Sequence, residues 1–325
     1  PVNPSVLFDA IMHAFGREVL RSSRAVQKDA SGLGALSRIR GARVLLVEDN
    51  DINQQVASEI LAAAGLKVSL ANNGQEAVDA VKDDDFHAVL MDVQMPVMDG
   101  YTATREIRRW EEQSPNPQSA FRIPIIAMTA HALAGDREKS LDAGMNDHVS
   151  KPIDPERLFE TLLKWIRKSP GGQLEKECSV ETDTASHASC DEPDFPELDG
   201  IHVAMGLKRL LGNKTSYRRI LLRFGREFEN AADTLRDLVN RAKYEEAEIL
   251  AHSIKGAGGN IGAEDLQAAA AVLEKGLKDG LKALPKEAFD HFKKELGRFM
   301  IALMALKEDD PSAPEMIEIP AGIDP

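Results

Sequence analysis

Three carboxylates in this sequence stand directly after or at the end of short apolar runs. Glu48 and Asp49 follow "RVLLV", and Asp92 closes "HAVLMD". If these runs are strands of one parallel sheet, their carboxyl ends meet at one edge and bring the three acids together. Carboxylates at close range repel one another unless a cation lies among them, and a few oxygen ligands suit Mg²⁺. The three acids therefore indicate a magnesium site.

Two further polar side chains follow apolar runs of the same kind. Thr129 comes after "PIIAM", and Lys151 comes after "NDHVS". A lysine ammonium pairs with a phosphoryl oxygen as a point charge, and a threonine hydroxyl can donate to another. Each feature alone is common, but all five side chains together favour a phosphoryl-transfer site with a carboxylate nucleophile.

A histidine stands among glycines in "AHSIKGAGGN", residues 251–260. At about 100° per residue, His252, Lys255, Gly256 and Gly259 lie along one strip of a helix. The opposite face carries the apolar residues Ala247, Leu250, Ile254 and Ala257. The imidazole is therefore expected to point away from the core of its domain.

The residue types in this strip fit phosphoryl chemistry at a protein surface. A neutral imidazole accepts a phosphoryl group at neutral pH, and Lys255 places a cation beside it. Gly256 and Gly259 would leave clearance for the active site of another protein. The alternative is a surface histidine beside a frayed helix end, because Gly258-Gly259-Asn260 also resembles a helix C-cap. Spacing alone leaves both interpretations open.

The segments that must position these groups alternate in type between residues 43 and 167. Five apolar runs are expected to be strands, at 43–50, 67–73, 87–92, 122–130 and 146–152. Amphipathic segments are expected to be helices, at 53–64, 74–82, 100–112, 134–143 and 155–167. This alternation predicts an α/β domain over residues 42–168, with a doubly wound five-stranded parallel sheet covered on both faces.

A second domain of a different class is predicted over residues 198–306. This region has no strand signal, and its apolar residues recur at the spacing of helices that share a bundle core, notably in 217–240 and 289–303. Residues 169–197 are polar and lack periodicity, so a flexible linker is expected there. The tail, 307–325, is expected to be disordered.

The first residues of the chain resemble a later segment of the same sequence. The segment "PVNPSVLFDAIMHAF" at Pro1 aligns with "PIDPERLFETLLKWI" at Pro152. Residues 1–16 are therefore expected to be the last helix of a preceding copy of the α/β domain, with 17–41 as a connector. The chain would then be a C-terminal piece of a longer protein.

Composition excludes several classes of function. The formal net charge is -13, from 53 acidic and 40 basic side chains, and no Lys/Arg cluster of a nucleic-acid reader stands out. No apolar run is long enough to span a membrane, so we expect no membrane contact by this segment. Cys178 and Cys190 both fall in the linker. Two free thiols suit a reducing compartment, and a cytoplasmic location is expected.

The first domain resembles the receiver domain of two-component response regulators. The resemblance rests on "VLLVEDNDINQ", "VLMDVQMPVMDG", "PIIAMTAHA" and "MNDHVSKPID". It implies a flavodoxin-like fold, Asp92 as the phospho-acceptor, and a cis peptide bond between Lys151 and Pro152.

The same resemblance implies a ligand set. Mg²⁺ would lie on Asp49, Asp92 and the backbone carbonyl of Gln94, with Glu48 assisting through water. The phosphoryl group would contact Thr129, the Ala130 backbone and Lys151. The sequence departs from the family at the aromatic switch position, which is His148 here.

The second domain resembles a histidine phosphotransfer (HPt) domain, a four-helix bundle. The resemblance rests on "HSIKGAGGNIGA" together with the upstream segment "LDGIHVAMGLKRLLGNKTSYRRILLRF". It implies that His252 is phosphorylated, with Lys255 as its electrostatic helper.

The two resemblances together imply a phosphorelay module from the C-terminus of a hybrid sensor histidine kinase. Its expected partners are the upstream kinase domain of the parent chain and response-regulator receivers that dock on the HPt face. The segment shows no ATP-binding kinase motif, so phosphotransfer without ATP-dependent autophosphorylation is expected. The alternative is a non-catalytic scaffold or allosteric module with vestigial phospho-sites. Whether the two domains dock on each other stays open.

Overall fold

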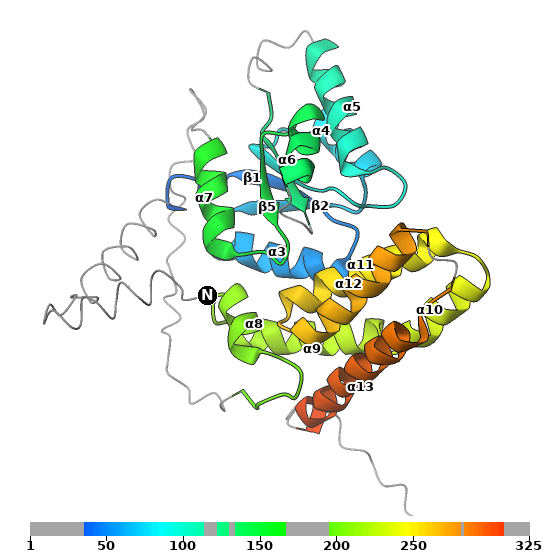
Figure 1. The fold of residues 1–325 in the computed structure, drawn as a ribbon. Coiled ribbons are helices and arrows are strands. Elements are labelled where there is room, and N and C mark those ends of the chain that lie inside the picture. The colour runs from blue at the N-terminus through cyan, green and yellow to red at the C-terminus, as the bar shows by residue number, and fades with distance from the viewer. Residues whose placement is uncertain (1–35, 114–121, 130–133, 167–194, 281–282, 309–325) are drawn as a thin grey trace, which may run out of the picture.

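The computed structural model describes residues 36–113, 122–129, 134–166, 195–280 and 283–308. Within these ranges the chain forms an α/β domain followed by an all-helical domain (Figure 1), so both parts of the predicted fold class are confirmed. The predicted helix at 1–16 lies outside the described residues, as do most of the connector, most of the linker with both cysteines, and the tail from 309.

The first domain is built on a five-stranded sheet in which every pairing is parallel. Its strands are β1 (Arg43–Val47), β2 (Lys67–Ala71), β3 (Ala88–Asp92), β4 (Ile125–Thr129) and β5 (Asp147–Ser150). Their order in the sheet is β2-β1-β3-β4-β5. β1, β3 and β4 are almost wholly buried, which explains why they read as unbroken apolar runs.

Helices cover both faces of this sheet. The helices of the domain are α3 (Asp51–Ala63), α4 (Gly74–Asp83), α5 (Gly100–Gln113), α6 (Ala134–Asp142) and α7 (Pro155–Trp165). Leu46 of β1 packs in one buried cluster with α3 and α7, and its neighbour Leu45 packs in a second cluster with α4 and α5. Successive strand residues therefore feed two separate cores.

The strand order changes direction at β1, and this places the predicted acids side by side. β1 lies between β2 and β3, so the carboxyl ends of β1 and β3 meet at the edge where ligands collect in open parallel sheets. Asn50 caps α3 just beyond this edge by accepting hydrogen bonds from the backbone N–H groups of Ile52 and Asn53. The cap begins α3 two residues earlier than the apolar pattern indicates.

The second domain is helical throughout its described residues. Its helices are α8 (Val203–Arg209), α9 (Lys214–Glu227), α10 (Ala231–Asn240), α11 (Tyr244–Asn260), α12 (Glu264–Lys278) and α13 (Lys286–Glu308). The four longest are α9, α11, α12 and α13. α11 packs on α12, α12 on α13, and α13 on α9. The ring of Phe224 lies 4.7 Å from those of Phe228 and Phe299, measured between centroids, at the centre of this packing.

The structure shifts several predicted boundaries. The periodic segment 217–240 is two helices, separated at residues 228–230, and α13 continues past the predicted domain end at 306 to Glu308. The α/β domain also begins earlier than residue 42, since Ile39 is buried in its core. Phe195 packs on the ring of Tyr217, which extends the helical domain upstream of 198.

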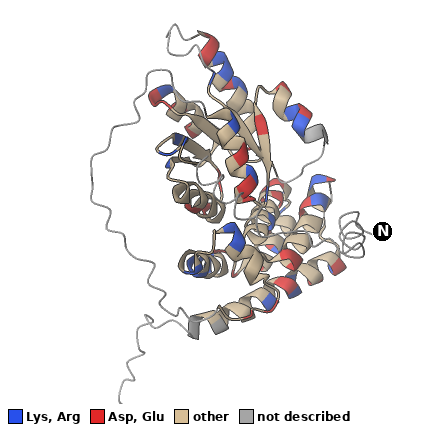
Figure 2. Ribbon diagram, turned by 90° about the vertical axis from the view of Figure 1, so that its left-hand side faces the viewer, with Lys and Arg blue, Asp and Glu red and all other residues tan. Residues whose placement is uncertain are grey.

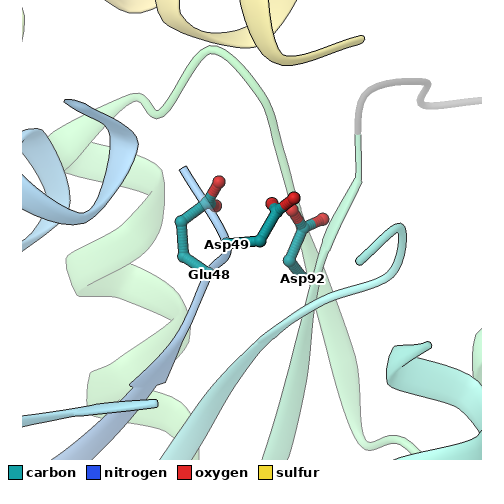
Figure 3. A group of neighbouring side chains, drawn as sticks. All are labelled: Glu48, Asp49 and Asp92. Carbon is teal, nitrogen blue, oxygen red and sulfur yellow. The ribbon is translucent and has the colours of Figure 1, made fainter. Parts of the chain in front are cut away.

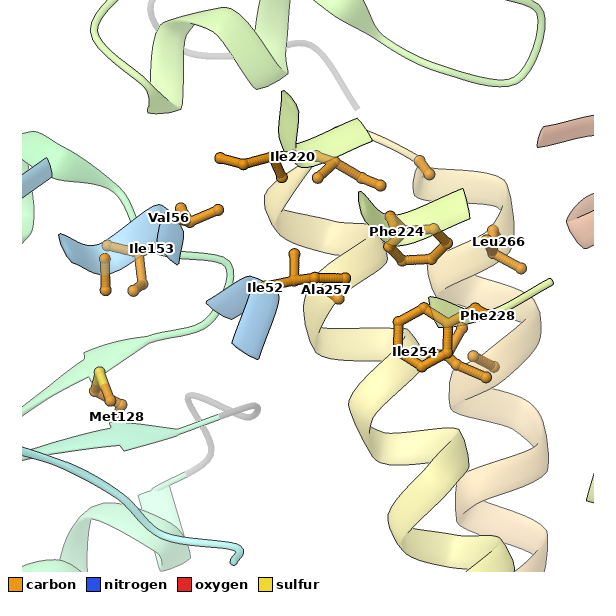
Figure 4. Packing of buried hydrophobic residues seen from close by; sticks show 14 of the residues in the cluster. Ile52, Val56, Met128, Ile153, Ile220, Phe224, Phe228, Ile254, Ala257 and Leu266 are labelled. Carbon is orange, nitrogen blue, oxygen red and sulfur yellow. The ribbon is translucent and has the colours of Figure 1, made fainter. Parts of the chain in front are cut away.

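The two domains pack against each other. α3 of the first domain contacts α9 and α11 of the second. Ile52 and Val56 of α3 belong to the same buried cluster as Ile220 of α9 and Ala257 of α11 (Figure 4). The sequence left open whether the two domains dock. In this structure they are docked.

Charged residues are interspersed along the helices of both domains (Figure 2). Among the described helices, none combines the length and apolar character that a bilayer span requires.

Candidate functional site

The three predicted acids converge at the carboxyl ends of β1 and β3 (Figure 3). One ligand oxygen from each of Glu48, Asp49 and Asp92 lies within 4.8 Å of the others. Glu48 and Asp92 are buried, whereas Asp49 is partly open. Three carboxylate oxygens at this separation fit a divalent cation with oxygen preference such as Mg²⁺. Gln94 lies beside them, and its backbone N–H donates to Asp92 Oδ1 at 3.4 Å.

Lys151 reaches into the same site from the end of β5. Its Nζ lies 2.6 Å from Glu48 Oε2 and 2.6 Å from Asp92 Oδ2. The Lys151–Pro152 peptide bond is cis. The Lys151 backbone N–H donates to the Thr129 carbonyl at 2.7 Å, which ties the ends of β4 and β5 together. The structure thus brings lysine, threonine and the acids to one edge of the sheet.

The electrostatics of this site favour an additional positive charge. Burial raises the pKa of Glu48 to about 7, and the neighbouring Asp92 carboxylate adds to the rise against the lowering effect of Lys151. Burial and Asp92 also raise the pKa of Asp49. Burial acts to lower the pKa of Lys151, but the charges of Asp92 and Glu48 outweigh it and raise that pKa. Each carboxylate here gains from a cation at its side.

The remaining predicted groups of this domain lie around the acids or outside the described residues. Thr129 is buried at the end of β4. His148 is partly exposed on β5, and its backbone N–H donates to the Asp147 carboxylate. Ala130, whose backbone was predicted to contact the phosphoryl group, falls in the segment 130–133 that is not described.

His252 lies on α11, where two neighbouring side chains fix its orientation. Its Nδ1 is 2.7 Å from Glu274 Oε1 of α12, and Lys255 Nζ donates to Glu274 Oε2 at 2.8 Å. An ionised carboxylate only accepts hydrogen bonds, so Nδ1 carries the proton in this contact and Nε2 keeps its lone pair. The contacts therefore leave Nε2 as the ring nitrogen with a free lone pair.

Glu274 is a functional residue that the sequence reasoning missed. It is only 4% exposed. Burial acts to raise its pKa, but the hydrogen bonds from His252 and Lys255 outweigh burial and lower the pKa to about 2. The available signal was an acid placed on the apolar stripe of its helix, since Glu274 follows Ala270 by four positions and Leu273 by one.

The structure corrects the expected exposure of the histidine strip. Only 12% of the His252 side chain is exposed, and Lys255 is buried against Glu274. α12 and the docked α/β domain cover the face that was expected to be open. Lys255 therefore reaches the imidazole through Glu274 and does not project beside it into solvent.

The two clearance glycines have different neighbours. A Cβ on Gly256 would lie 3.1 Å from Asn53 Nδ2 of the α/β domain, so the missing side chain gives room for the docked receiver-like face. A Cβ on Gly259 would lie 2.5 Å from Gln267 Nε2 of α12. Gly259 was predicted to leave room for another protein. That prediction was wrong, because the space beside Gly259 is filled by α12 of the same domain. The helix also continues through both glycines to Asn260, so the C-cap interpretation of 258–260 is wrong.

A cleft of about 340 Å³ joins the two candidate centres. Its walls include Asp49, Gln94 and Met95 from the α/β domain. Glu248, Ile249 and His252 of α11 line the opposite side. The structure therefore places the edge of the acid site and the imidazole on one shared space.

Comparison with known proteins matches the two domains separately. Residues 44–163 match the family model of the response regulator receiver domain, and residues 219–301 match that of the Hpt domain. The chain is 40% identical over 146 residues to the sensor protein GacS of Pseudomonas syringae pv. syringae, which covers 45% of this chain and 15% of GacS. It is 42% identical over 122 residues to the signal transduction histidine-protein kinase BarA of Escherichia coli (strain K12), which covers 38% of this chain and 12% of BarA.

A similar solved structure is the receiver domain of sensor histidine kinase PA1611 from Pseudomonas aeruginosa PAO1, which holds a magnesium ion in its active site cleft. It is 46% identical, with a TM-score of 0.35, and the match covers 39% of this chain and 98% of that one. The chain spans less than a sixth of the curated relatives GacS and BarA. The chain therefore carries a response regulator receiver domain over residues 44–163, followed by an Hpt domain over residues 219–301.

Proposed function

We propose that a phosphoryl group passes between Asp92 of the receiver domain and His252 of the Hpt domain. The observation that carries this proposal is the shared cleft, which has Asp49 of the acid site on one wall and His252 on the other. Two phospho-acceptors of a relay must approach each other with little water between them. The docked chain brings Asp49 of the acid site and the His252 imidazole to one cleft without an outside partner.

The transfer step follows from the side chains at each end. Nε2 of His252 attacks the phosphorus of an acyl phosphate on Asp92, and an N–P bond forms as the bond from phosphorus to the Asp92 oxygen breaks. The electron pair of that bond returns to the carboxylate, and the imidazole becomes positively charged. The proton on Nδ1 stays there, hydrogen-bonded to Glu274, so no proton has to leave before the N–P bond forms. The reverse step uses the same groups.

The other residues have supporting roles in this proposal. Lys151 and Thr129 would hold phosphoryl oxygens on the receiver side, together with the Ala130 backbone. A magnesium ion held by Asp49, Asp92 and the Gln94 carbonyl, with Glu48 assisting, would neutralise charge on those oxygens when bound. On the Hpt side, Glu274 would stabilise the imidazolium, and Lys255 would hold Glu274 in place.

The chain is further proposed to act as part of a hybrid sensor histidine kinase in the cytoplasm. The support is its similarity to sensor and histidine kinases that are several times longer. The kinase domain of such a parent would deliver the phosphoryl group to Asp92. Response-regulator receivers that dock on the Hpt domain would take it from His252.

The test is phosphate uptake by the full chain from acetyl phosphate and Mg²⁺, compared with the variants Asp92→Asn and His252→Gln. We expect Asp92→Asn to take up no label, because the small donor reacts at the aspartate first. His252→Gln should keep the base-stable phosphohistidine fraction at zero while retaining the base-labile aspartyl phosphate. A wild-type chain that takes up no phosphate would instead support a scaffold with vestigial sites.

A further inference from the structure

The contact between the two domains has a charged rim. Arg219 of α9 pairs with Glu59 of α3 at 2.5 Å, and Arg223 of α9 pairs with Asp51. α3 supplies the acids of these pairs and α9 supplies the arginines. These side chains are between 27% and 60% exposed, so such pairs steer association and add little affinity.

Inside that rim lies a buried pair of amides. Asn53 of α3 is 3% exposed and Asn260 at the end of α11 is 1% exposed. Asn260 Nδ2 donates to Asn53 Oδ1 at 2.8 Å, and Asn260 Oδ1 accepts from the backbone N–H of Ile153 at 3.1 Å. Both polar atoms of the Asn260 side chain thus have their partners across the domain boundary.

The amide pair is also tied to the receiver site. Asn53 Nδ2 donates to Glu48 Oε1 at 2.8 Å, and Glu48 Oε2 accepts from Lys151. Ile153 follows Lys151 by two residues. Asn260 therefore hydrogen-bonds to the receiver at Asn53 and at Ile153, on either side of the phosphoryl site. These two contacts fix where α11 lies relative to Asp92.

Gly256 makes the amide contact possible. Asn53 Nδ2 lies 3.1 Å from the position that a Gly256 Cβ would take. A side chain there would crowd Asn53 away from α11. The apolar contacts around the pair, from Ile52 and Ala257, exclude water that could otherwise satisfy an unpaired amide.

We infer that the Asn53–Asn260 pair is a recognition contact, by which the Hpt domain selects a receiver whose α3 presents an amide at this position. The receiver of the same chain meets that condition. An outside receiver with an apolar residue there would leave Asn260 Nδ2 buried and without its hydrogen-bond partner. The loss of such a hydrogen bond weakens docking by about fivefold to about a hundredfold.

This inference has a second consequence for access to His252. The receiver of the same chain occupies the α9 and α11 face that an outside receiver needs. Weakening the amide pair from the receiver side should therefore expose His252 to a receiver on another molecule. The inference deepens the proposed function, but domain docking can be measured without any phosphoryl transfer.

The first experiment measures docking alone in the full chain. Dyes are placed on exposed positions of the two domains through Lys82→Cys and Arg241→Cys, with Cys178 and Cys190 replaced by serine. Asn260→Ala and Asn53→Ala should each lower the docking equilibrium constant, measured by energy transfer, about five- to hundredfold. The double variant should dock as well as the single variant that docks less, because the two amides form one contact. The matched control, Arg219→Ala, should change docking less than about fivefold.

The second experiment uses one substitution in two places. A chain with His252→Gln is phosphorylated at Asp92 and mixed with a chain that carries Asp92→Asn and an intact His252. Asn53→Ala in the acceptor chain should raise transfer between the chains, because its own receiver no longer covers His252. In a donor chain already undocked by Asn260→Ala, the added Asn53→Ala should lower it. A folding defect cannot produce opposite signs.

The outcomes separate the two claims. Unchanged docking in Asn260→Ala and Asn53→Ala, with helical content intact by circular dichroism, would overturn the recognition contact. Docking that depends on both amides while wild-type chains transfer no phosphate would uphold the contact and refute the proposed function. Equal effects of Asn53→Ala in donor and acceptor would overturn the inferred competition.

Discussion

Glu274 hydrogen-bonds to two side chains, His252 and Lys255, for different reasons. His252 requires a fixed ring, and Lys255 requires a partner for a buried charge. Glu274→Gln can still contact both groups, but it cannot hold an imidazolium with a negative charge. We expect this variant to slow transfer to His252 by on the order of a hundredfold, with little change in docking. Single-turnover transfer from Asp92, read beside the energy-transfer signal, separates the two effects.

Glu274→Ala should additionally destabilise the Hpt domain. It leaves the Lys255 ammonium buried without a counter-charge, and breaking such a pair costs about 3–5 kcal/mol. Urea unfolding followed by circular dichroism measures the change. If Glu274→Ala and Glu274→Gln lose the same small amount of stability, the carboxylate is not the partner that keeps Lys255 buried.

The lowered pKa of Glu274 predicts a defined pH window. Its folded-state pKa is about 2, below the ordinary value of 4.5, so the unfolded state binds more protons in between. The stability that Glu274 contributes is complete above about pH 4.5 and is lost as the pH falls toward about 2. The difference in unfolding free energy between wild type and Glu274→Gln should therefore be constant near neutral pH and shrink below pH 4.5. A constant difference down to pH 3 would contradict the assigned ionisation.

At the scale of elements, the first residue of α5 packs against the last residue of β3, and a glycine makes that close approach possible. A Cβ on Gly100 would lie 2.1 Å from the backbone oxygen of Asp92, which cannot move without displacing the proposed phospho-acceptor. Gly100→Ala should cost about 1–3 kcal/mol and reduce phosphate uptake at Asp92. Gly297 in α13 offers a matched control, because nothing lies within 4 Å of its added Cβ.

Gly297→Ala should stabilise the protein by about 0.5–1 kcal/mol, since alanine is favoured over glycine inside a helix. The same chemical change thus has opposite signs in the two elements. Urea unfolding of both variants, with acetyl phosphate labelling of Asp92, checks the pair. Two losses of similar size would show that the approach of α5 to β3 is not the cause.

The elements of the receiver domain could be predicted because burial on both faces of the sheet leaves unbroken apolar runs. The three acids could be placed for the same reason, since Glu48 and Asp49 follow such a run and Asp92 ends one. Asn53 and Asn260 could not, because polar residues on helices read as solvent-exposed until a partner surface is known. Glu274 shows the complementary limit. Its helix could be predicted, but not which groups of α11 would meet it.

At the scale of the whole molecule, the docked arrangement depends on sequence-distant faces that match in shape and charge. α3 contributes Glu59 and Asp51 where α9 contributes Arg219 and Arg223. No local pattern in either helix names the other as its partner. The match becomes visible only when both domains are folded, which is why the sequence left docking undecided.

A charge exchange across the rim tests this arrangement directly. Arg219→Glu places two acids together and should lower the docking equilibrium constant by up to about fivefold, because exposed pairs contribute about 0.2–1 kcal/mol. Adding Glu59→Arg should restore docking, since the pair is rebuilt with its signs reversed. Both effects should fade as salt rises, because the screening length falls from about 10 Å at 0.1 M to about 3 Å at 1 M. The amide variants should keep their effect at high salt, because Asn53 and Asn260 are uncharged and buried. If the exchanged pair fails to restore docking that Arg219→Glu has lost, α3 and α9 do not meet in solution as they do here.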